Sequence, residues 1–277
     1  MAPDRPSIAD KRQTFARLHE AGCFAIPNPW DAGSARYLQS LGFKAIATTS
    51  SGFAWTQGRP DNGVSREQVL AHLEAMVAAT DLPVNADFEG GFAHDPAGVA
   101  ESVRLAVRTG VAGLSIEDST GDATRPLYDL TVAVDRIRAA RRAIDQSGGD
   151  TLLVGRAECY LVGRADIGET TTRLRAYAQA GADCLYAPGL KTPEDIAAVV
   201  AAVSPKPVNV LVGSAGGLGM LDLASLGVRR VSVGGALARA AWGGFMRAAR
   251  LLAEQGRFDE FAHAASGDEL NALFSAP

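Results

Sequence analysis

Short apolar runs recur along the chain, and most of them follow a helix-like segment that ends in glycine. Glycine just beyond a helix takes the left-handed backbone conformation that ends it. The apolar run after each glycine shows no polar alternation, which is typical of strands buried on both faces. Five such junctions occur: Ala21-Gly22, Leu41-Gly42, Thr109-Gly110, Ala180-Gly181 and Leu226-Gly227.

Three further apolar runs begin without that glycine, and they read LPVNADFE, DTLLVGRAE and KPVNVLVG. Together with the first five they predict eight strands. The predicted strands are residues 23–27, 43–49, 83–88, 112–117, 151–156, 183–187, 207–212 and 229–233.

Amphipathic helical patterns lie between the predicted strands: Arg66–Thr80, Pro96–Thr109, Thr131–Ser147, Glu169–Ala180 and Pro193–Val203. Eight strands alternating with helices predict the α/β class and a (β/α)₈ TIM-type barrel. An open, doubly wound sheet is the alternative, but no GxGxxG motif follows the first strand. Since no linker or low-complexity run divides the chain, we expect residues 1–277 to form one domain.

Residues 236–277 form a helical region beyond the last predicted strand. Within it, Trp242, Phe245, Met246 and Leu252 give an apolar face larger than a final barrel helix needs. An apolar excess of this kind indicates a subunit interface. We therefore expect this C-terminal region to serve oligomerisation.

Composition narrows the range of partners. The 277 residues carry a net charge of −4 and show no basic cluster, so a nucleic-acid partner is not expected. The N-terminus lacks a signal-peptide core and no apolar run could span a bilayer, so we expect a cytoplasmic protein without a membrane partner. Cys23, Cys159 and Cys184 lack CxxC spacing, which favours reduced thiols over a disulfide or zinc site.

The four histidines show no metal-binding spacing. His19, His72 and His263 fall in amphipathic helical patterns and are expected at the surface. His94 follows an acidic turn closely and is a weaker candidate for a role in a site.

The most informative segment is the acidic turn after the third predicted strand, where Asp87 and Glu89 precede Gly90 and Gly91. On a continuing strand, side chains two residues apart point to the same side. Two carboxylates held that close repel each other unless a cation lies between them. An isolated Asp-x-Glu is more often a plain acidic turn than a cation site. The residues at the other strand ends therefore determine which interpretation is favoured.

Those other strand ends also carry polar residues. In a barrel of this type the carboxyl ends of the strands form the active site. Strand two is followed by Ser51-Gly52-Phe53 and then Asp61; strand four ends at Glu117, strand five at Arg156, and strand seven contributes Asn209. A cation together with an anionic, carboxylate-bearing substrate would account for the whole set.

Each of these groups has a chemical reason to be there. Mg²⁺ usually keeps several waters and takes one or two direct carboxylates, which leaves other acids to hold its waters. Arg156 can bind a carboxylate through two parallel hydrogen bonds, although an internal salt bridge with Glu158 is an equally good interpretation. The N–H groups of Gly52 and Phe53 can form an anion-binding nest.

The order of motifs resembles the isocitrate lyase/phosphoenolpyruvate mutase superfamily. The similar segments are Ser-Gly-Phe…Pro-Asp, Asn-Ala-Asp-Phe-Glu-Gly-Gly, Ser-Ile-Glu-Asp and Gly-Arg-Ala-Glu, within residues 12–250. The resemblance implies a (β/α)₈ barrel whose last helix is exchanged between subunits of a homotetramer, a dimer of dimers.

The resemblance also implies residue roles. Mg²⁺, which Mn²⁺ can replace, would be bound directly by Asp87, with Asp61, Glu89 and Glu117 ordering its waters. Ser51, Gly52, Phe53 and Arg156 match the positions that hold the 2-oxo-carboxylate end of the substrate. Among these residues, Asp61, Glu117 and Arg156 are the catalytic candidates, and Asn209 is a further substrate-binding candidate.

Two departures limit the resemblance. Isocitrate and methylisocitrate lyases carry a Lys-Lys/Arg-Cys-Gly-His motif after the Ile-Glu-Asp strand, whereas this chain has no cysteine in residues 117–129. The Lys-x-Asn-Ser loop of the mutase and of phosphonopyruvate hydrolase is also missing. Asp122, Arg125 and Tyr128, in loop 119–130, are candidates for the missing acid or for specificity.

The sequence therefore favours a Mg²⁺-dependent lyase that cleaves a C–C bond of a small 2-oxo- or 2-hydroxy-carboxylate through an enolate. Oxaloacetate decarboxylation fits because it needs a metal and an enolate but no dedicated cysteine. Two alternatives remain open. One is cleavage or rearrangement of the C–P bond of phosphonopyruvate, and the other is a non-catalytic protein that binds 2-oxo acids.

Overall fold

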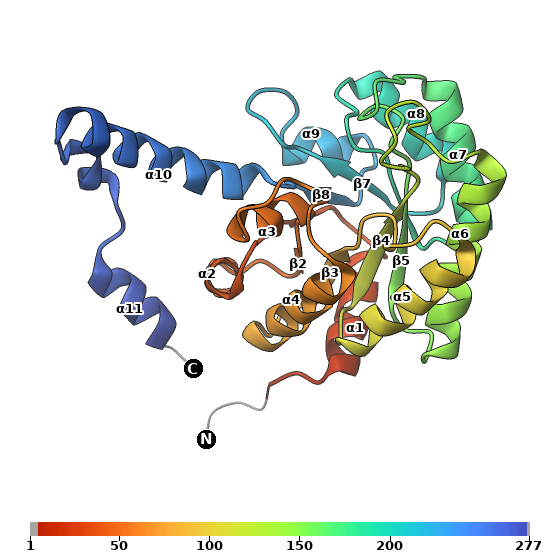
Figure 1. Ribbon diagram of the computed structural model, residues 1–277. Helices are drawn as coiled ribbons and strands as arrows, with labels where there is room; N and C mark the ends of the chain where they lie inside the picture. Colours follow the sequence, from red (N-terminus) through yellow and green to blue (C-terminus); the bar gives the residue numbers. More distant parts are fainter. Residues whose placement is uncertain (1–4, 276–277) are drawn as a thin grey trace.

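Eight parallel strands form a nearly closed barrel in the computed structural model, which describes residues 5–275 (Figure 1). The sheet order is β1-β8-β7-β6-β5-β4-β3-β2, and every pair is parallel. The strands are β1 Phe24–Ile26, β2 Ile46–Ala47, β3 Val84–Asp87, β4 Gly113–Glu117, β5 Leu152–Arg156, β6 Cys184–Tyr186, β7 Val208–Leu211 and β8 Arg230–Ser232. All eight predicted strands are confirmed, each shorter than its predicted range, and the open doubly wound alternative is wrong.

The seam between β1 and β2 is the weakest part of the ring. One backbone hydrogen bond crosses it, from Ala47 N to Pro27 O at 3.0 Å. Asn28 adds a side-chain bond, from its Nδ2 to Thr48 O at 2.9 Å. Its Oδ1 accepts the N–H groups of Val233 and Gly234, both at 2.9 Å. Asn28 therefore ties the ends of β2 and β8 together at the seam.

Helices surround the barrel and lie between successive strands (Figure 1). They are α1 Ile8–Leu18, α2 Ala32–Ser40, α3 Ser50–Thr56, α4 Arg66–Ala79, α5 Pro96–Arg108, α6 Leu130–Gln146, α7 Ile167–Gln179, α8 Pro193–Val203, α9 Met220–Ser225, α10 Ala236–Gln255, the 3₁₀ helix η1 Asp259–His263 and α11 Gly267–Ser275. The predicted helical segments correspond to α4, α5, α6, α7 and α8. The short helix α3 is not among the predicted segments.

Glycine directly follows the C-cap of four helices, as the sequence predicted, whereas Gly22 lies three residues beyond His19, the C-cap of α1. The five glycines of the predicted junctions all have positive φ: Gly22 +75°, Gly42 +84°, Gly110 +88°, Gly181 +107° and Gly227 +85°. Only glycine adopts this conformation at little cost, so Gly42, Gly110, Gly181 and Gly227 fix where α2, α5, α7 and α9 stop.

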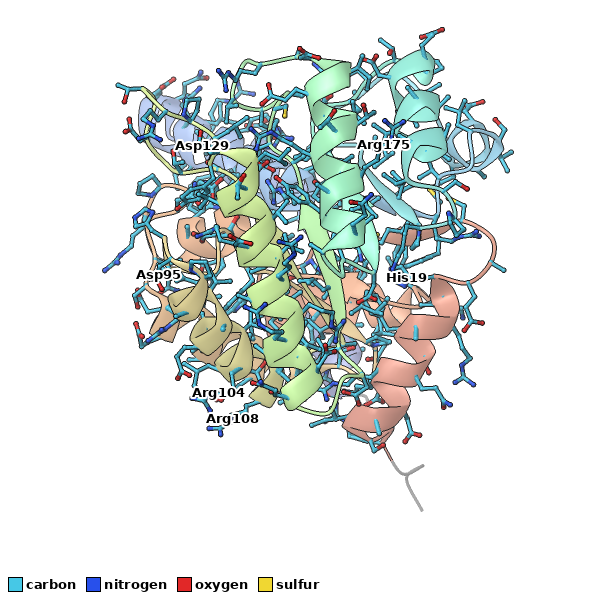
Figure 2. The ribbon with its side chains drawn as sticks, turned by 90° about the vertical axis from the view of Figure 1, so that its right-hand side faces the viewer. His19, Asp95, Arg104, Arg108, Asp129 and Arg175 are labelled. Atoms are coloured by element: carbon cyan, nitrogen blue, oxygen red, sulfur yellow. The ribbon has the colours of Figure 1, made fainter. Side chains whose placement is uncertain are left out.

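Helix α1 lies against the amino-terminal ends of the strands. Phe15 is fully buried there, and a Cβ added at Gly113 would lie 2.7 Å from its ring. Figure 2 shows α1 with His19 at its end, beside α5, α6 and α7 on the outside of the barrel. The prediction that His19 and His72 lie at the surface is wrong, because both are largely covered. His72 stacks on Phe53 with ring centroids 3.9 Å apart.

Helix α10 leaves the barrel after β8 and projects away from it, and α11 returns towards α2 (Figure 1). Ala238 is its only buried residue, while Phe245 and Met246 are 62% and 49% exposed. The predicted apolar face is thus present and uncovered in the single chain. Among the described residues, no helix combines the length and apolar character needed to cross a membrane.

Candidate active site

A polar cavity of about 160 Å³ lies inside the barrel towards the carboxyl ends of the strands. Its size corresponds to about five water molecules, which suits a small metabolite. Its lining includes Ser51, Asp61, Asp87, Arg156 and Asn209 of the predicted set. The predicted site residues Gly52, Phe53, Glu89 and Glu117 lie outside that lining, although Glu117 contacts Arg156 directly.

Arg156 is the centre of the acid cluster. Its Nη1 lies 3.2 Å from Asp87 Oδ1 and 3.2 Å from Glu117 Oε2. Its Nε and Nη2 both donate to the carboxylate of Glu158, the second at 3.3 Å. The ring of Tyr186 faces the guanidinium, 5.2 Å away. The internal salt bridge with Glu158 is therefore real, and it extends to two of the predicted metal-site acids.

Strand register explains why these side chains meet. Glu117 of β4 and Arg156 of β5 are directly paired in the sheet. Asp87 ends β3 next to Ser115, two residues before Glu117. Side chains at the carboxyl ends of three neighbouring parallel strands thus point to one place, as the barrel fold requires.

Asp87 is held from the other side by the start of α3. Its Oδ2 accepts the N–H of Ser50 at 3.0 Å and the Ser50 hydroxyl at 2.9 Å. Its own N–H donates to Thr48 Oγ1 at 2.9 Å. The carboxylate is therefore fixed in orientation, with one oxygen towards α3 and the other towards Arg156.

Glu89 does not continue the strand, which corrects the expectation for Asp87-x-Glu89. Strand β3 ends at Asp87, and Glu89 adopts a left-handed backbone with φ of +48°, which is uncommon for a residue other than glycine. Its Oε1 is buried and makes no hydrogen bond to any described residue. Burial and the nearby charge of Asp87 raise the pKa of Glu89 to about 7.

The pKa values of two other acids in the cluster, Glu117 and Asp61, are also raised. Burial raises the pKa of Glu117 to about 8, against the opposing effect of Arg156. Burial, followed by the charge of Asp87, raises the pKa of Asp61. The cluster therefore holds more negative charge than its one arginine neutralises, which is the condition that a cation relieves.

These residues fit a hydrated Mg²⁺ better than a fully protein-coordinated ion. Within residues 5–275, no group of three or more His, Cys, Asp or Glu side chains is arranged to coordinate an ion directly. Mg²⁺ keeps most of its waters and needs one or two direct carboxylates. The oxygen donors at Asp61, Asp87 and Glu117 and the unpaired Oε1 of Glu89 are suited to that mode.

The predicted nest at Gly52 and Phe53 is engaged by its own helix. Gly52 N donates to Thr49 Oγ1 at 3.3 Å, and Phe53 N donates to Thr49 O at 3.0 Å. Ser51 differs, since it lines the cavity, and its Oγ lies 3.1 Å from Thr49 Oγ1. Of the three residues, Ser51 alone belongs to the cavity lining, so the nest stays a prediction.

Loop 119–130 is held by local bonds beside the site. Ser119 and Leu127 form an antiparallel bridge, and Tyr128 OH lies 2.5 Å from His94 Nδ1. Hydrogen bonds from Thr124 lower the pKa of Asp122, which makes that carboxyl a weak candidate for the missing acid. His94 therefore contributes to the anchoring of the loop in this structure.

Asp118 is a buried residue whose role the sequence did not indicate. Asp118 Oδ1 accepts Glu158 N at 2.8 Å, and its Oδ2 accepts Tyr177 OH at 2.6 Å. Arg173 Nη1 lies 3.2 Å from the same Oδ2. The network thus fixes Glu158, which in turn holds Arg156. The only feature of the sequence that pointed to Asp118 was an acidic residue directly after Glu117.

Asn209 is fully buried and committed to its neighbours. Its Oδ1 accepts Arg230 Nε, and its Nδ2 donates to Ser232 Oγ, both at 2.9 Å. It therefore supports Arg230, which also lines the cavity and is not among the predicted site residues. The feature of the sequence that could have indicated Arg230 as a site residue is its position inside the predicted strand at residues 229–233.

Comparisons with known proteins agree with this architecture. The family model described as phosphoenolpyruvate phosphomutase matches residues 15–253. The crystal structure of a candidate lyase/mutase from Burkholderia cenocepacia J2315 is 49% identical, with a TM-score of 0.95 and 98% of each chain covered.

Two relatives with named activities match the chain at lower identity. The 2-methylisocitrate lyase of Escherichia coli K12 is 30% identical over 62% of this chain and 59% of its own length. An oxaloacetate decarboxylase of Bradyrhizobium sp. BTAi1 is 28% identical over 76% of this chain and 73% of its own. The chain therefore belongs to the phosphoenolpyruvate phosphomutase family, within the isocitrate lyase/phosphoenolpyruvate mutase superfamily of lyases and mutases.

Proposed function

We propose that this protein is a Mg²⁺-dependent lyase that cleaves a C–C bond of a small 2-oxo- or 2-hydroxy-carboxylate, such as oxaloacetate. The observation that carries the proposal is the cluster of Asp87, Glu117 and Arg156 beside a small polar cavity. The relatives named oxaloacetate decarboxylase and 2-methylisocitrate lyase support the same class of reaction.

The metal would be held mainly by Asp87, directly, and by Asp61, Glu89 and Glu117 through water. A bound Mg²⁺, or Mn²⁺ in its place, would supply positive charge that lowers the energy of an enolate. Burial raises the pKa values of Asp61 and Glu89, and the charges of neighbouring acids raise them further. A bound cation would therefore stabilise these carboxylates even before substrate binds.

Arg156 has the geometry to bind the substrate carboxylate. Its Nη1 is shared between Asp87 and Glu117, two acids that a cation would neutralise. That nitrogen is then available for a substrate oxygen, while Glu158 keeps the guanidinium plane fixed through Nε and Nη2. Ser51 Oγ offers a second polar contact from the cavity wall.

Variants of Asp87 and Arg156 test this assignment. We expect Asp87→Ala and Arg156→Ala each to lower kcat/KM for oxaloacetate or methylisocitrate about 100-fold or more, since each removes a group at the reacting end. Asp135→Ala and Arg138→Ala, which break an exposed pair on α6, should leave it unchanged. The proposal would be contradicted if the purified protein, supplied with Mg²⁺ or Mn²⁺, turned over none of a panel of oxo and hydroxy acids.

Chemistry at a C–P bond is the second candidate. The matching family model is named for phosphoenolpyruvate phosphomutase, which favours it. The missing Lys-x-Asn-Ser loop argues against it. A ³¹P NMR assay with phosphonopyruvate distinguishes C–P chemistry from the C–C lyase. Loss or migration of the phosphonate signal would favour the C–P reaction.

A further inference from the structure

The barrel contains a second buried arginine, and this one has no acidic partner. Arg230 at the start of β8 is 3% exposed. No carboxylate of the described residues lies within ion-pair distance of it, whereas Arg156 contacts three. A buried cation without a counter-ion is costly, so its retention inside the barrel calls for an explanation.

Neutral groups hold Arg230 in place. Nε donates to Asn209 Oδ1 at 2.9 Å, and Nη1 lies 3.4 Å from Asn85 Oδ1 and 3.3 Å from His19 Nε2. His19 Nδ1 lies 2.8 Å from Phe15 O, which can only accept, so Nδ1 carries the proton and Nε2 is the acceptor for Arg230. These bonds orient the guanidinium but leave its charge uncompensated.

The guanidinium also borders the cavity. Arg230 is part of the cavity lining together with Asn85 and Asn209. Its Nη2 makes no hydrogen bond to any residue within 5–275, so two N–H groups remain for a ligand. The interior of a (β/α)₈ barrel at this level is normally filled by branched apolar side chains. Here it carries two amides and an arginine instead.

The position of Arg230 relative to the acid cluster suggests the length of its ligand. Its partner Asn85 lies two residues before Asp87 on β3. Two residues of a parallel strand advance by about 6.6 Å. That separation is similar to the length of a four-carbon dicarboxylate, so one such molecule can reach from the Asp87 level to the Arg230 level.

We propose that Arg230 binds a second carboxylate of the ligand, so that the cavity selects small dicarboxylates over the corresponding monocarboxylates. Arg156 takes the carboxylate beside the metal site, and Arg230 takes the far one. The inference rests on the proposed function for the choice of 2-oxo and 2-hydroxy acids, and it narrows that choice to four-carbon diacids.

Malate and lactate form a matched pair of probes, because malate is lactate with one added carboxylate. Titration calorimetry of the full-length protein in Mg²⁺ should show tighter binding of malate to the wild type. Arg230→Gln should raise the Kd for malate about tenfold or more and that for lactate less than threefold. Arg230→Lys, which keeps the charge, should recover part of the malate affinity.

Arg229→Gln is the control, since Arg229 precedes Arg230 but donates to Gly22 O, away from the cavity. It should change neither Kd. Circular dichroism checks that each variant is folded. If Arg230→Gln does not fold, the preference of the wild type for malate over lactate and the affinities of Arg230→Lys test the proposal.

Equal affinity of the wild type for malate and lactate would overturn the proposal. Equal losses of affinity for the two acids in Arg230→Gln, or no binding of malate at millimolar concentration, would also overturn it. A malate preference without turnover of any acid would reject the lyase but keep the role of Arg230.

Discussion

Arg156 and Arg230 are two buried arginines of one barrel, and they differ in their surroundings. Arg156 contacts three carboxylates, whereas Arg230 is held by amides and a histidine. Residue type alone does not reveal this difference, because both arginines lie within predicted strands. The positions of the acids on neighbouring strands determine which arginine is neutralised.

His19 makes stability depend on pH in the acid range. It is packed against Phe15 and Phe24, with ring centroids 4.6 and 5.2 Å away, and burial lowers its pKa to about 3. The unfolded chain protonates histidine below about pH 6.5. Between these values the unfolded state binds more protons, so the free energy of unfolding falls as the pH drops from about 6.5 towards 3.

We therefore expect His19→Gln to lessen the acid destabilisation between pH 7 and 4 by about 2 kcal/mol, allowing for partial exposure. Urea unfolding at a series of pH values measures it. His263→Gln in the exposed helix η1 is the control and should follow the wild type. Parallel pH curves for His19→Gln and the wild type would contradict the assignment.

Asp118 should matter for both stability and the site. Asp118→Asn leaves Arg173 with one fewer charged partner and disturbs the bond to Glu158 N. Because breaking a buried pair leaves an uncompensated charge, we expect a loss of about 3 kcal/mol. Asp135→Asn breaks an exposed pair and should cost less than about 1 kcal/mol. Chemical denaturation of both variants compares them, and equal effects would show that Asp118 is not a key support.

At the scale of elements, the contact between α1 and β4 depends on one missing side chain. A Cβ on Gly113 would lie 2.7 Å from the Phe15 ring and 2.8 Å from Asn85 Oδ1. Gly113→Ala should therefore destabilise the protein by about 2 kcal/mol through overpacking. Gly267→Ala, where a Cβ meets nothing within 4 Å, should change stability by less than about 0.5 kcal/mol. Urea midpoints give the comparison, and a neutral Gly113→Ala would show that α1 can shift freely.

Much of the element order could be predicted from the sequence, because glycine punctuation and unalternating apolar runs are local signals. The predicted strands 112–117 and 151–156 correspond closely to β4 and β5. Helix α3 could not be predicted, since Ser50–Thr56 is only 7 residues long and its first turn depends on the Thr49 cap.

The candidate site was predictable where the strand ends carry acids, as at Asp87 and Glu117. It was less predictable where contacts come from far along the chain. The bonds of Asp118 to Tyr177 and of Arg230 to His19 span 59 and 211 residues. Such partners become visible only when the barrel closes and brings distant segments together.

At the scale of the whole molecule, α10 and the groove it leaves uncovered predict association. A groove of about 570 Å³ lies between α2, β1, β8 and α9, and its lining is mostly apolar. A helix after β8 would usually cover this position, but α10 projects away from it (Figure 1). The arrangement supports the predicted exchange of the last helix between subunits.

Phe245→Glu should weaken that association, since it places a charge on the exposed apolar face of α10. Light scattering after size exclusion should show an oligomer for the wild type and a smaller species for the variant. Val132→Glu, on α6, is the control and should keep the wild-type mass. A monomeric wild type at micromolar concentration would contradict the prediction.

The seam between β1 and β2 has a consequence for how the barrel opens. Every other pair of neighbouring strands is joined by a ladder, but here one backbone bond from Ala47 and the side chain of Asn28 close the ring. Local opening begins where few bonds must break. The amide of Ala47 should therefore exchange its hydrogen with solvent sooner than those in the middle of β4 or β5. Because Ala47, Thr48 and Asn28 also line the cavity, a bound ligand should slow this exchange.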